Sequence, residues 1–558
     1  MIWRSLRVLQ RPLVQVAFCI AAHAALLVWT AIDDSPTSLE TTYVAAGVLL
    51  WETGGTSEFP QNPPLAKALL ALPARLHLQI AGVPDAVPES PPRSFPSTFA
   101  NELTAWLGPR VLVLVHLGRI AAVIGSILCA WLLYVAGRRL AGHRAGLCAS
   151  FLWCFSGLAL ANGHLATADV FSAVGAALCA LAAVFFAENG RISQAVLLGL
   201  SLALAVALKL TLFLLFPVGL LLVSLYPRAN IRQGLLRAGA FTTAWFFGLY
   251  VFFLFSPPVL LGPEYWVPQS HLLRKVFAFQ PLRILFTLLP GNLLLGIDWQ
   301  AHAFEIPEGS IWLLGTLRPL PQPLYYPVAF VLKEPLGFLA LLAAGLVGVL
   351  LAWPSGRLGS AQKVFVWFGF VGAAVLGAAL LTNSTVCEYR YVTALLPFLV
   401  LPAALGLAVW ANRWVGRAVI LLGMLAVLEV LAFSPHYVAF GNLLAGGPYG
   451  LWRYLPRSAV DRGQDWYRLR RWLDAQPELD RAAVLGLPTE RATLLGLSTR
   501  VSPTNRPAPV VVPVSYVTGE ARYVRHPGDP EDLARWLRTL ATQRPAAHPT
   551  PGTFLYYY

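Results

Sequence analysis

The sequence carries little charge for its length. Only 12% of its 558 residues are Asp, Glu, Lys or Arg, whereas 57% are hydrophobic. A soluble protein of this size needs more charge on its surface, so this composition excludes a water-soluble globular fold. The apolar residues form continuous runs that do not alternate with polar residues, which indicates membrane-spanning helices rather than barrel strands. We therefore predict an all-α polytopic membrane protein.

Cysteine is also scarce. Five of the six cysteines lie in apolar runs, and the sixth, Cys387, lies in a short polar connection. Their spacing matches neither a metal site nor a disulfide framework. We interpret them as small packing residues, and we predict no metal site from them.

Acidic residues are fewer than basic ones, and the formal net charge is +14. This excess could indicate a nucleic-acid partner, but the basic residues gather in short connections between apolar runs. A Lys/Arg excess in alternate short loops marks the cytoplasmic side of a membrane protein. We therefore predict no nucleic-acid partner. The basic segments are residues 1–11, "GRRLAGHR", "YPRANIRQ", "WPSGRLGSAQK" and "ANRWVGR".

Hydrophobicity predicts about eleven membrane crossings, each long enough for a bilayer. If the N-terminus is cytoplasmic, an odd number of crossings places the C-terminus outside, and every basic connection then lies inside. Abundant Ala, Leu, Arg and Pro with little Lys is typical of a GC-rich bacterium, so we expect a multi-pass protein of the bacterial inner membrane. The predicted spans are 12–32, 110–136, 145–161, 168–187, 194–208, 210–226, 235–256, 325–352, 364–382, 391–410 and 415–433.

Two domains are predicted. Residues 1–433 form the transmembrane domain, with outer loops at 33–109 and 257–324, and residues 434–558 form an extracytoplasmic α/β module. Amphipathic pieces of the outer loops, such as "PLAKALLALPARLHL", are expected to lie along the membrane surface. In the module, the predicted helices are "RGQDWYRLRRWLDA" and "DPEDLARWLRTL", and the predicted strands are "AAVLGL", "PVVVPVSYV" and "TFLYYY".

Carboxylates stand at the outer ends of the predicted spans. Asp33, Asp34 and Glu40 follow the first span, and Asp169 begins the fourth. Asp169 could be only a helix cap or a partner of the helix dipole. It lies on the same predicted membrane face as Glu40, however, so the two acids could share one site and act in proton transfer.

Three basic residues interrupt apolar segments: Lys209, Arg390 and Lys333. A Lys at the bilayer centre costs about 2.5–3.5 kcal/mol, so Lys209 is expected where two half-length helices meet at the outer interface. There, Lys209 and Arg390 could bind a lipid phosphate or diphosphate. The alternatives are a snorkelling lysine, an Arg390–Glu388 interface anchor, and local pairing of Lys333 with Glu334.

Several ordered motifs resemble one known family. They resemble the protein O-mannosyltransferases and the related bacterial lipid A aminoarabinose transferases. The resemblance covers nearly the whole chain, and it depends on the order of the motifs more than on any one of them. The motifs are "AAGVLLWETGGTSEFPQNPPLAKALLALP", "LATADV", "ALKLT", "WLLGTLRPLPQPLYYPVAFVLKEPLG", "EYRYVTALLPF" and "HYVAFGNLLAGGPYGLWRYLPRSAVDRGQD".

This resemblance implies an inverting glycosyltransferase of the GT-C fold. Such an enzyme takes a sugar from a polyprenyl-phosphate carrier and transfers it, among membrane lipids, to a lipid, glycan or protein acceptor on the outer face. Matched residue by residue, Glu40 falls on the second acid of the family's acidic pair, Asp169 on its second acidic motif, Lys209 on a phosphate-contacting lysine and Arg390 on the arginine of "RYLLP". Family members differ over a divalent metal, so no cofactor is assigned. The candidate substrate-binding residues are Tyr43, Asn62, Pro63, Lys67, His164, Tyr325 and Tyr326.

The sequence also departs from the family pattern. Leu39 occupies the place of the first acid, Asn62 that of a His, and Arg457 and Arg462 those of an Asp and a Trp. Leucine cannot accept a proton, so the base must be another carboxylate, of which Glu40 is the simplest choice, or the protein is a non-catalytic relative that binds a polyprenyl lipid. A transporter is a further alternative, but it should show an internal repeat, which we do not find. Tyr325 and Tyr326 could stack on a sugar or belong to the aromatic belt of the membrane.

Overall fold

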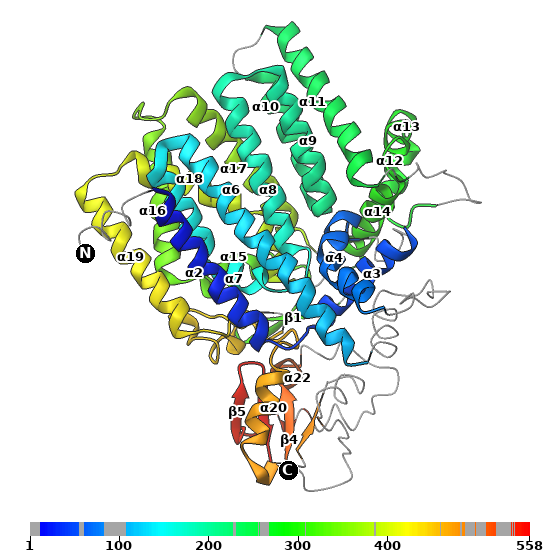
Figure 1. Cartoon of the computed structure of the whole chain (residues 1–558), viewed down its shortest axis with the longest axis vertical. Helices are drawn as coiled ribbons and strands as arrows, with labels where there is room; N and C mark the ends of the chain where they lie inside the picture. The colour runs from blue at the N-terminus through cyan, green and yellow to red at the C-terminus, as the bar shows by residue number, and fades with distance from the viewer. Residues whose placement is uncertain are drawn as a thin grey trace.

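The computed structural model shows a bundle of long helices with a small strand-containing module at one end (Figure 1). This arrangement confirms the mostly helical fold class. The residues that the structure describes are 12–54, 61–82, 108–226, 230–254, 256, 267–306, 309–383, 387–457, 459–479, 482–485, 497, 509–519, 537, 539–540 and 542–557.

Apolar helices cover the predicted spans, but not every span is a single helix. The predicted spans 110–136 and 145–161 meet within α6, where Ala141 and Gly142 have non-helical dihedrals and divide it into two helices. Trp153 in the second part donates a 3.1 Å hydrogen bond to the carbonyl of Ser126 in the first, so the two parts lie side by side. The main helices are α2 (Pro12–Asp33), α6 (Arg110–Cys154), α8 (Asp169–Asn189), α9 (Ile192–Leu208), α10 (Phe216–Leu225), α11 (Ile231–Phe252), α16 (Leu336–Ala352), α17 (Ser360–Leu381), α18 (Leu396–Val409) and α19 (Arg413–Ala432).

Among the described residues, six helices are long and apolar enough to cross a membrane, and a seventh span is possible if a bent pair is counted as one. This pair is α15 (Tyr325–Lys333) and α16, which meet at 116°. The prediction of one straight span over 325–352 is therefore wrong. Pro335 follows the extended residue Glu334, and a proline disfavours helical geometry in the residue before it. The total of eleven crossings stays a prediction.

Helix α8 lies in the interior of the bundle, where it packs against α6, α9 and α17. Its inward positions are mostly Ala, Gly and Cys. A Cβ added at Gly175 would lie 2.9 Å from the Cα of Ala205 on α9, so the two backbones approach closely. This packing buries the N-terminus of α8, and with it Asp169.

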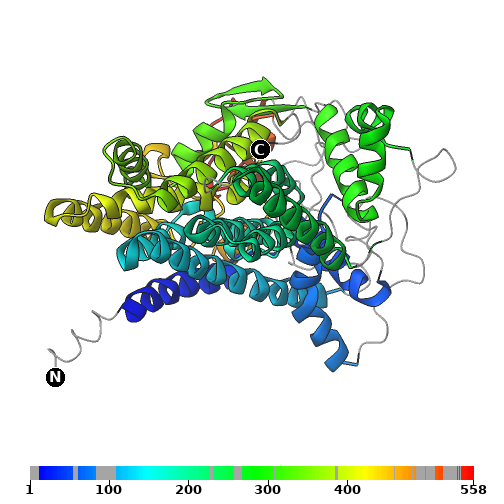
Figure 2. The ribbon, with the colours of Figure 1, turned by 90° about the horizontal axis from the view of Figure 1, so that it is seen from above.

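The predicted outer loop 33–109 contains two helices, α3 (Ser38–Thr53) and α4 (Pro64–Ile80), which pack against each other. A Cβ added at Gly47 would lie only 2.3 Å from the carbonyl oxygen of Lys67, so the contact requires glycine. Figure 2 shows the blue α3 and α4 beside the green helices of the predicted outer loop 257–324. These are α12 (His271–Ala278), α13 (Gln280–Thr287) and α14 (Gly291–Glu305), which a hairpin of β1 (Ser310–Leu313) and β2 (Thr316–Pro319) follows.

The C-terminal module contains a four-stranded sheet of order β3-β4-β6-β5, with β3 parallel to β4 and the other pairs antiparallel. The predicted strand "PVVVPVSYV" is wrong in its second half, which forms the short helix α22 (Val514–Val517), and strand β5 was not predicted. Of the predicted helix "DPEDLARWLRTL", residues 529–536 lie outside the described residues. The elements are α20 (Trp466–Asp474), β3 (Ala483–Val484), β4 (Val510–Pro513), β5 (Ala547–Thr550) and β6 (Thr553–Tyr556).

Candidate active site

A cavity of about 440 Å³ lies where α3, α8, α14, α17 and the 3₁₀ helix η2 (Tyr389–Ala394) converge. One part of its wall is polar and carries ionisable side chains, and another part is apolar. The polar lining includes Tyr43, Asn62, Asp169, Lys209, Glu388 and Arg390, and the apolar lining includes Leu39, Phe304, Leu376, Ala379 and Leu380. Such a wall suits a ligand with a charged head and a hydrocarbon tail.

Asp169 lies at the centre of the polar wall, and its side chain is 1% exposed. It is the first residue of α8, where the helix dipole favours a negative charge. Its Oδ1 lies 3.2 Å from Lys209 Nζ, and its Oδ2 lies 3.4 Å from a terminal nitrogen of Arg390. The hydroxyl of Thr167 donates a further hydrogen bond of 3.1 Å to Oδ2. Asp169 therefore holds two cations at the cavity.

Lys209 reaches the cavity because the helix stops there. It is the C-terminal cap of α9 in extended geometry (φ −156°, ψ 121°), and the 3₁₀ helix η1 (Leu210–Leu215) follows directly. This is the meeting of two short helices that the sequence predicts. The ammonium group also lies 5.9 Å from the ring centre of Tyr391, a distance at which a cation is attracted to an aromatic face.

Arg390 lies in η2, with its guanidinium 5.2 Å from the ring centre of Tyr391. Its Nε forms an ion pair with Oε2 of Glu388, which also lines the cavity. The sequence motif indicated Arg390 as a ligand-binding residue and Glu388 only as its partner. The structure brings both to the same wall as Asp169 and Lys209.

The predicted outer loop 33–109 lines the cavity through Leu39, Tyr43 and Asn62. The Tyr43 hydroxyl donates a 2.5 Å hydrogen bond to Oδ1 of Asn62, and Pro63 then leads into α4. From α14, Gln300 donates a 2.8 Å hydrogen bond to the carbonyl of Gln61 and so ties the two predicted outer loops together. Gln300 and its neighbour Trp299 also line the cavity, and no sequence pattern indicated either of them.

Glu40 does not lie among the residues of the cavity wall. It forms a buried ion pair with Arg119, with distances of 2.7 and 2.8 Å, and accepts hydrogen bonds from the N–H groups of Thr37 and Ala166. Burial alone would raise the pKa of Glu40, but Arg119 and these donors lower it to about 2. A carboxylate so fully bonded is a poor base, so the geometry does not support the prediction that Glu40 accepts the acceptor's proton.

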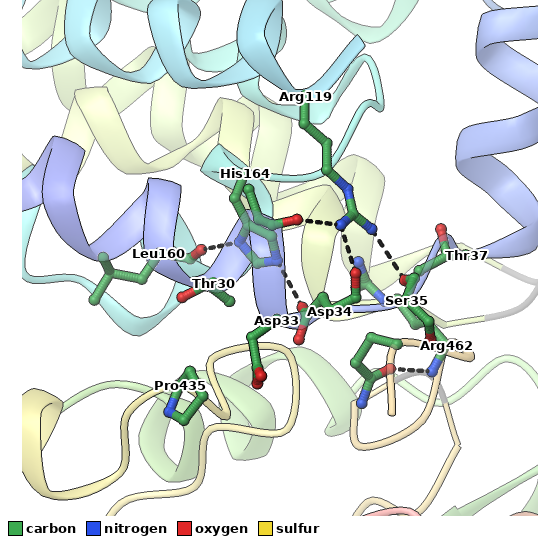
Figure 3. Close-up of polar contacts among 12 residues, drawn as sticks. Thr30, Asp33, Asp34, Ser35, Thr37, Arg119, Leu160, His164, Pro435 and Arg462 are labelled. Carbon is green, nitrogen blue, oxygen red and sulfur yellow. Dashed lines mark hydrogen bonds and ion pairs between the residues drawn. The ribbon is translucent and has the colours of Figure 1, made fainter. Parts of the chain in front are cut away.

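Asp33 and Asp34 also lie apart from the cavity wall. Both form ion pairs with Arg468 of α20, each at 2.6 Å, and Arg471 pairs with Asp33 as well. His164 lies 2.8 Å from the other oxygen of Asp34, and Figure 3 shows the ring pointing at this carboxylate. This cluster fastens the C-terminal module to the C-terminal end of α2. It does not support a catalytic role for either aspartate, or substrate binding by His164.

Arg119 fixes the same connection from the side of the bundle. Its terminal nitrogens donate hydrogen bonds of 2.6, 2.7 and 3.0 Å to the carbonyl oxygens of Ala31, Asp34 and Ser35. Figure 3 shows the guanidinium directed at the turn between α2 and α3. This turn precedes Leu39 and Tyr43, so Arg119 positions one wall of the cavity.

The remaining candidates are buried near the cavity without being part of its wall. Lys333 Nζ donates 2.8 Å to the carbonyl of Val438 and also bonds the carbonyl of Ala459, so it braces the start of the C-terminal module. Tyr325 and Tyr326 are too deeply buried for an aromatic belt, and the Tyr326 hydroxyl accepts a 2.9 Å hydrogen bond from Asn383 of the cavity wall. Lys67 is likewise buried. Among the described residues, no group of three or more His, Cys, Asp or Glu could hold a metal ion.

Comparison with known proteins gives one family match. Residues 115–260, about a quarter of the chain, match the model of the family described as dolichyl-phosphate-mannose-protein mannosyltransferase. This segment includes Asp169 and Lys209, and the match confirms there the resemblance that the sequence motifs indicate. No curated protein matches the sequence.

Two solved structures are similar at low identity. ArnT from Cupriavidus metallidurans bound to undecaprenyl phosphate is 14% identical, with 97% of each chain covered and a TM-score of 0.45. The archaeal oligosaccharyltransferase AglB from Archaeoglobus fulgidus, in complex with an inhibitory peptide and a dolichol-phosphate, is 12% identical with a TM-score of 0.44. That match covers 94% of this chain and 63% of AglB.

Proposed function

We propose that the protein is a membrane glycosyltransferase that moves a sugar from a polyprenyl-phosphate donor to a hydroxyl group of a lipid, glycan or protein. The single observation that carries this proposal is that two cations, Lys209 and Arg390, line the same cavity as a group of apolar residues. The family match over residues 115–260 supports the same class of enzyme.

The two cations provide a site for the donor's phosphate. Lysine and arginine are the side chains that bind phosphate oxygens best, and both reach Asp169 at 3.2–3.4 Å in the absence of a ligand. A bound phosphate would form ion pairs with Lys209 and Arg390 and so replace part of their pairing with Asp169. The apolar residues Leu376, Ala379 and Leu380 of α17 then offer a path for the isoprenoid chain.

The proposed reaction is an inverting transfer. The acceptor oxygen attacks the anomeric carbon on the face opposite the phosphate, so the configuration at that carbon is inverted. Lys209 and Arg390 stabilise the charge that develops on the departing phosphate, and a carboxylate of the cavity wall takes the proton of the acceptor hydroxyl.

The outer face of the membrane is the proposed place of transfer. If the N-terminal end of α2 is cytoplasmic, its C-terminal end lies outside, as do the start of α8 and the end of α9 after the intervening crossings. These ends carry Asp169 and Lys209. Residues 1–433 would then hold the active site, and residues 434–558 would form a module docked on its outer side through Arg468.

One observation favours a second candidate. Leu39 lines the cavity at the position where the family that it resembles has an acid. A relative that lost this acid could bind a polyprenyl phosphate without transferring a sugar. The two functions differ in turnover and share the binding step, so one assay separates them.

The test is transfer from a panel of labelled polyprenyl-phosphate sugars to native lipid and protein fractions by the purified protein. We expect transfer by the wild type and a loss of about 10- to 100-fold in Lys209→Gln, because a hydrogen bond to a charged group is removed. Lys275→Gln, an exposed lysine of α12, is the matched control and should transfer normally. Binding of polyprenyl phosphate without transfer from any donor would instead identify the non-catalytic relative.

A further inference from the structure

Two carboxylates of described residues line the cavity, Asp169 and Glu388, and their surroundings differ. The Asp169 side chain is 1% exposed, whereas that of Glu388 is 19% exposed. Only a carboxylate that a ligand can reach can accept a proton from it. Because a ligand can reach Glu388 more easily than Asp169, we assign the two carboxylates different roles.

Both carboxylate oxygens of Asp169 already have partners. Its two oxygens face Lys209, Arg390 and the Thr167 hydroxyl, which leaves little room for an incoming hydroxyl group. Asp169 is suited to hold the phosphate-binding cations in place.

The side chain of Glu388 is more open to the cavity than that of Asp169. It precedes η2 in extended geometry (φ −132°, ψ 129°), and its ion pair with Arg390 Nε engages Oε2. Its side chain lines the cavity and is more exposed than that of Asp169, so an acceptor hydroxyl can approach it. Arg390 lies between Glu388 and Asp169, so a phosphate bound at Arg390 would stand beside this base.

We propose that Glu388 is the general base of the transfer reaction, an assignment that rests on the proposed function. The acceptor oxygen forms a bond to the anomeric carbon while the bond from that carbon to the phosphate oxygen breaks. The phosphate departs with the electron pair toward Lys209 and Arg390, and the hydroxyl proton moves to the carboxylate of Glu388, which later releases it to water. Glu388 thus replaces the acid that is missing at Leu39.

The charged and titratable groups near Glu388 come from four parts of the chain. Arg390 and Tyr391 belong to its own segment, Arg462 to the C-terminal module, and Asp169 and Lys209 to α8 and the end of α9. Arg390 and Arg462 place positive charge beside the Glu388 carboxylate.

The test compares Glu388→Gln and Glu388→Asp with the wild type. We expect Glu388→Gln to transfer at least 100-fold more slowly, which is the lower end of the range for loss of a general base, and to bind undecaprenyl phosphate within threefold of the wild type. Glu388→Asp should restore part of the rate.

Glu478→Gln, which changes an exposed glutamate of the C-terminal module, is the control and should behave like the wild type. A Glu388→Gln variant that transfers at more than a third of the wild-type rate would overturn the assignment. Equal losses of transfer and lipid binding would also overturn it, because Glu388 would then serve only to position Arg390. Failure of the wild type to transfer any sugar would refute the proposed function itself, so the two failures are distinguishable.

Discussion

Replacing Asp169 by asparagine is expected to lower the rate of sugar transfer on the order of 100-fold without weakening the binding of undecaprenyl phosphate. The carboxylate orients Lys209 and Arg390, and small misplacements of groups that act on the transition state cost about this much. Its negative charge also competes with the phosphate for the same cations. The neutral amide keeps the shape of the side chain, but it no longer competes.

The measurements are the transfer rate at saturating donor and the affinity for undecaprenyl phosphate. Asp474→Asn is a matched control, because Asp474 forms only an exposed ion pair with Arg470 one turn away on α20. Tenfold weaker lipid binding by Asp169→Asn would contradict the account. It would mean that Asp169 does not compete with the phosphate and that the lipid binds elsewhere.

Glu40→Gln is expected to reduce the free energy of unfolding by about 3–5 kcal/mol, the usual cost of breaking a buried ion pair. The substitution leaves the Arg119 guanidinium buried with no carboxylate, although its bonds to the carbonyls of the α2–α3 turn remain. Thermal unfolding in detergent micelles measures the loss. Because this turn leads to the cavity wall, the variant should lose activity through its fold.

Glu52→Gln provides the control on the same helix. Glu52 pairs with Arg75 at 3.0 Å in a partly exposed position, and such pairs contribute about 1 kcal/mol or less. Equal stability losses in the two variants would contradict the structural role of Glu40. A large loss of transfer by Glu40→Gln at unchanged stability would return Glu40 to the list of candidate bases.

The same ion pair makes a pH prediction. The pKa of Glu40 is about 2 in the folded protein, against an ordinary value of 4.5. Because the folded pKa is the lower one, the stabilisation is present above about pH 4.5 and is lost as the pH falls toward 2. This difference corresponds to about 3 kcal/mol, which the Glu40→Gln variant should lack.

The sequence predicts the helical bundle well, because membrane-spanning helices need long apolar runs. It misses the 116° bend between α15 and α16, because the span 325–352 was drawn on hydrophobicity alone and the effect of Pro335 on the residue before it was not weighed. It also misses half of a strand in the C-terminal module. Val514–Val517 has the β-branched composition of a strand but forms a short helix.

The sequence predicts those site residues whose charge lies within an apolar run. Asp169, Lys209 and Arg390 stand out because a charged residue in an apolar run requires a reason, and the structure brings all three to one cavity. Glu40 was misassigned because sequence order does not show which way a side chain points. Glu388 was hidden beside Arg390, since an adjacent acid and base look like a local ion pair in sequence.

The most direct test of the central claim is an experimental structure of the protein with undecaprenyl phosphate bound. The account predicts that the phosphate lies about 3 Å from Lys209 Nζ and from the Arg390 guanidinium, a normal hydrogen-bond distance. The first isoprenoid units should run along Leu376, Ala379 and Leu380 of α17. A phosphate bound at another site, with Lys209 and Arg390 still paired to Asp169, would contradict it.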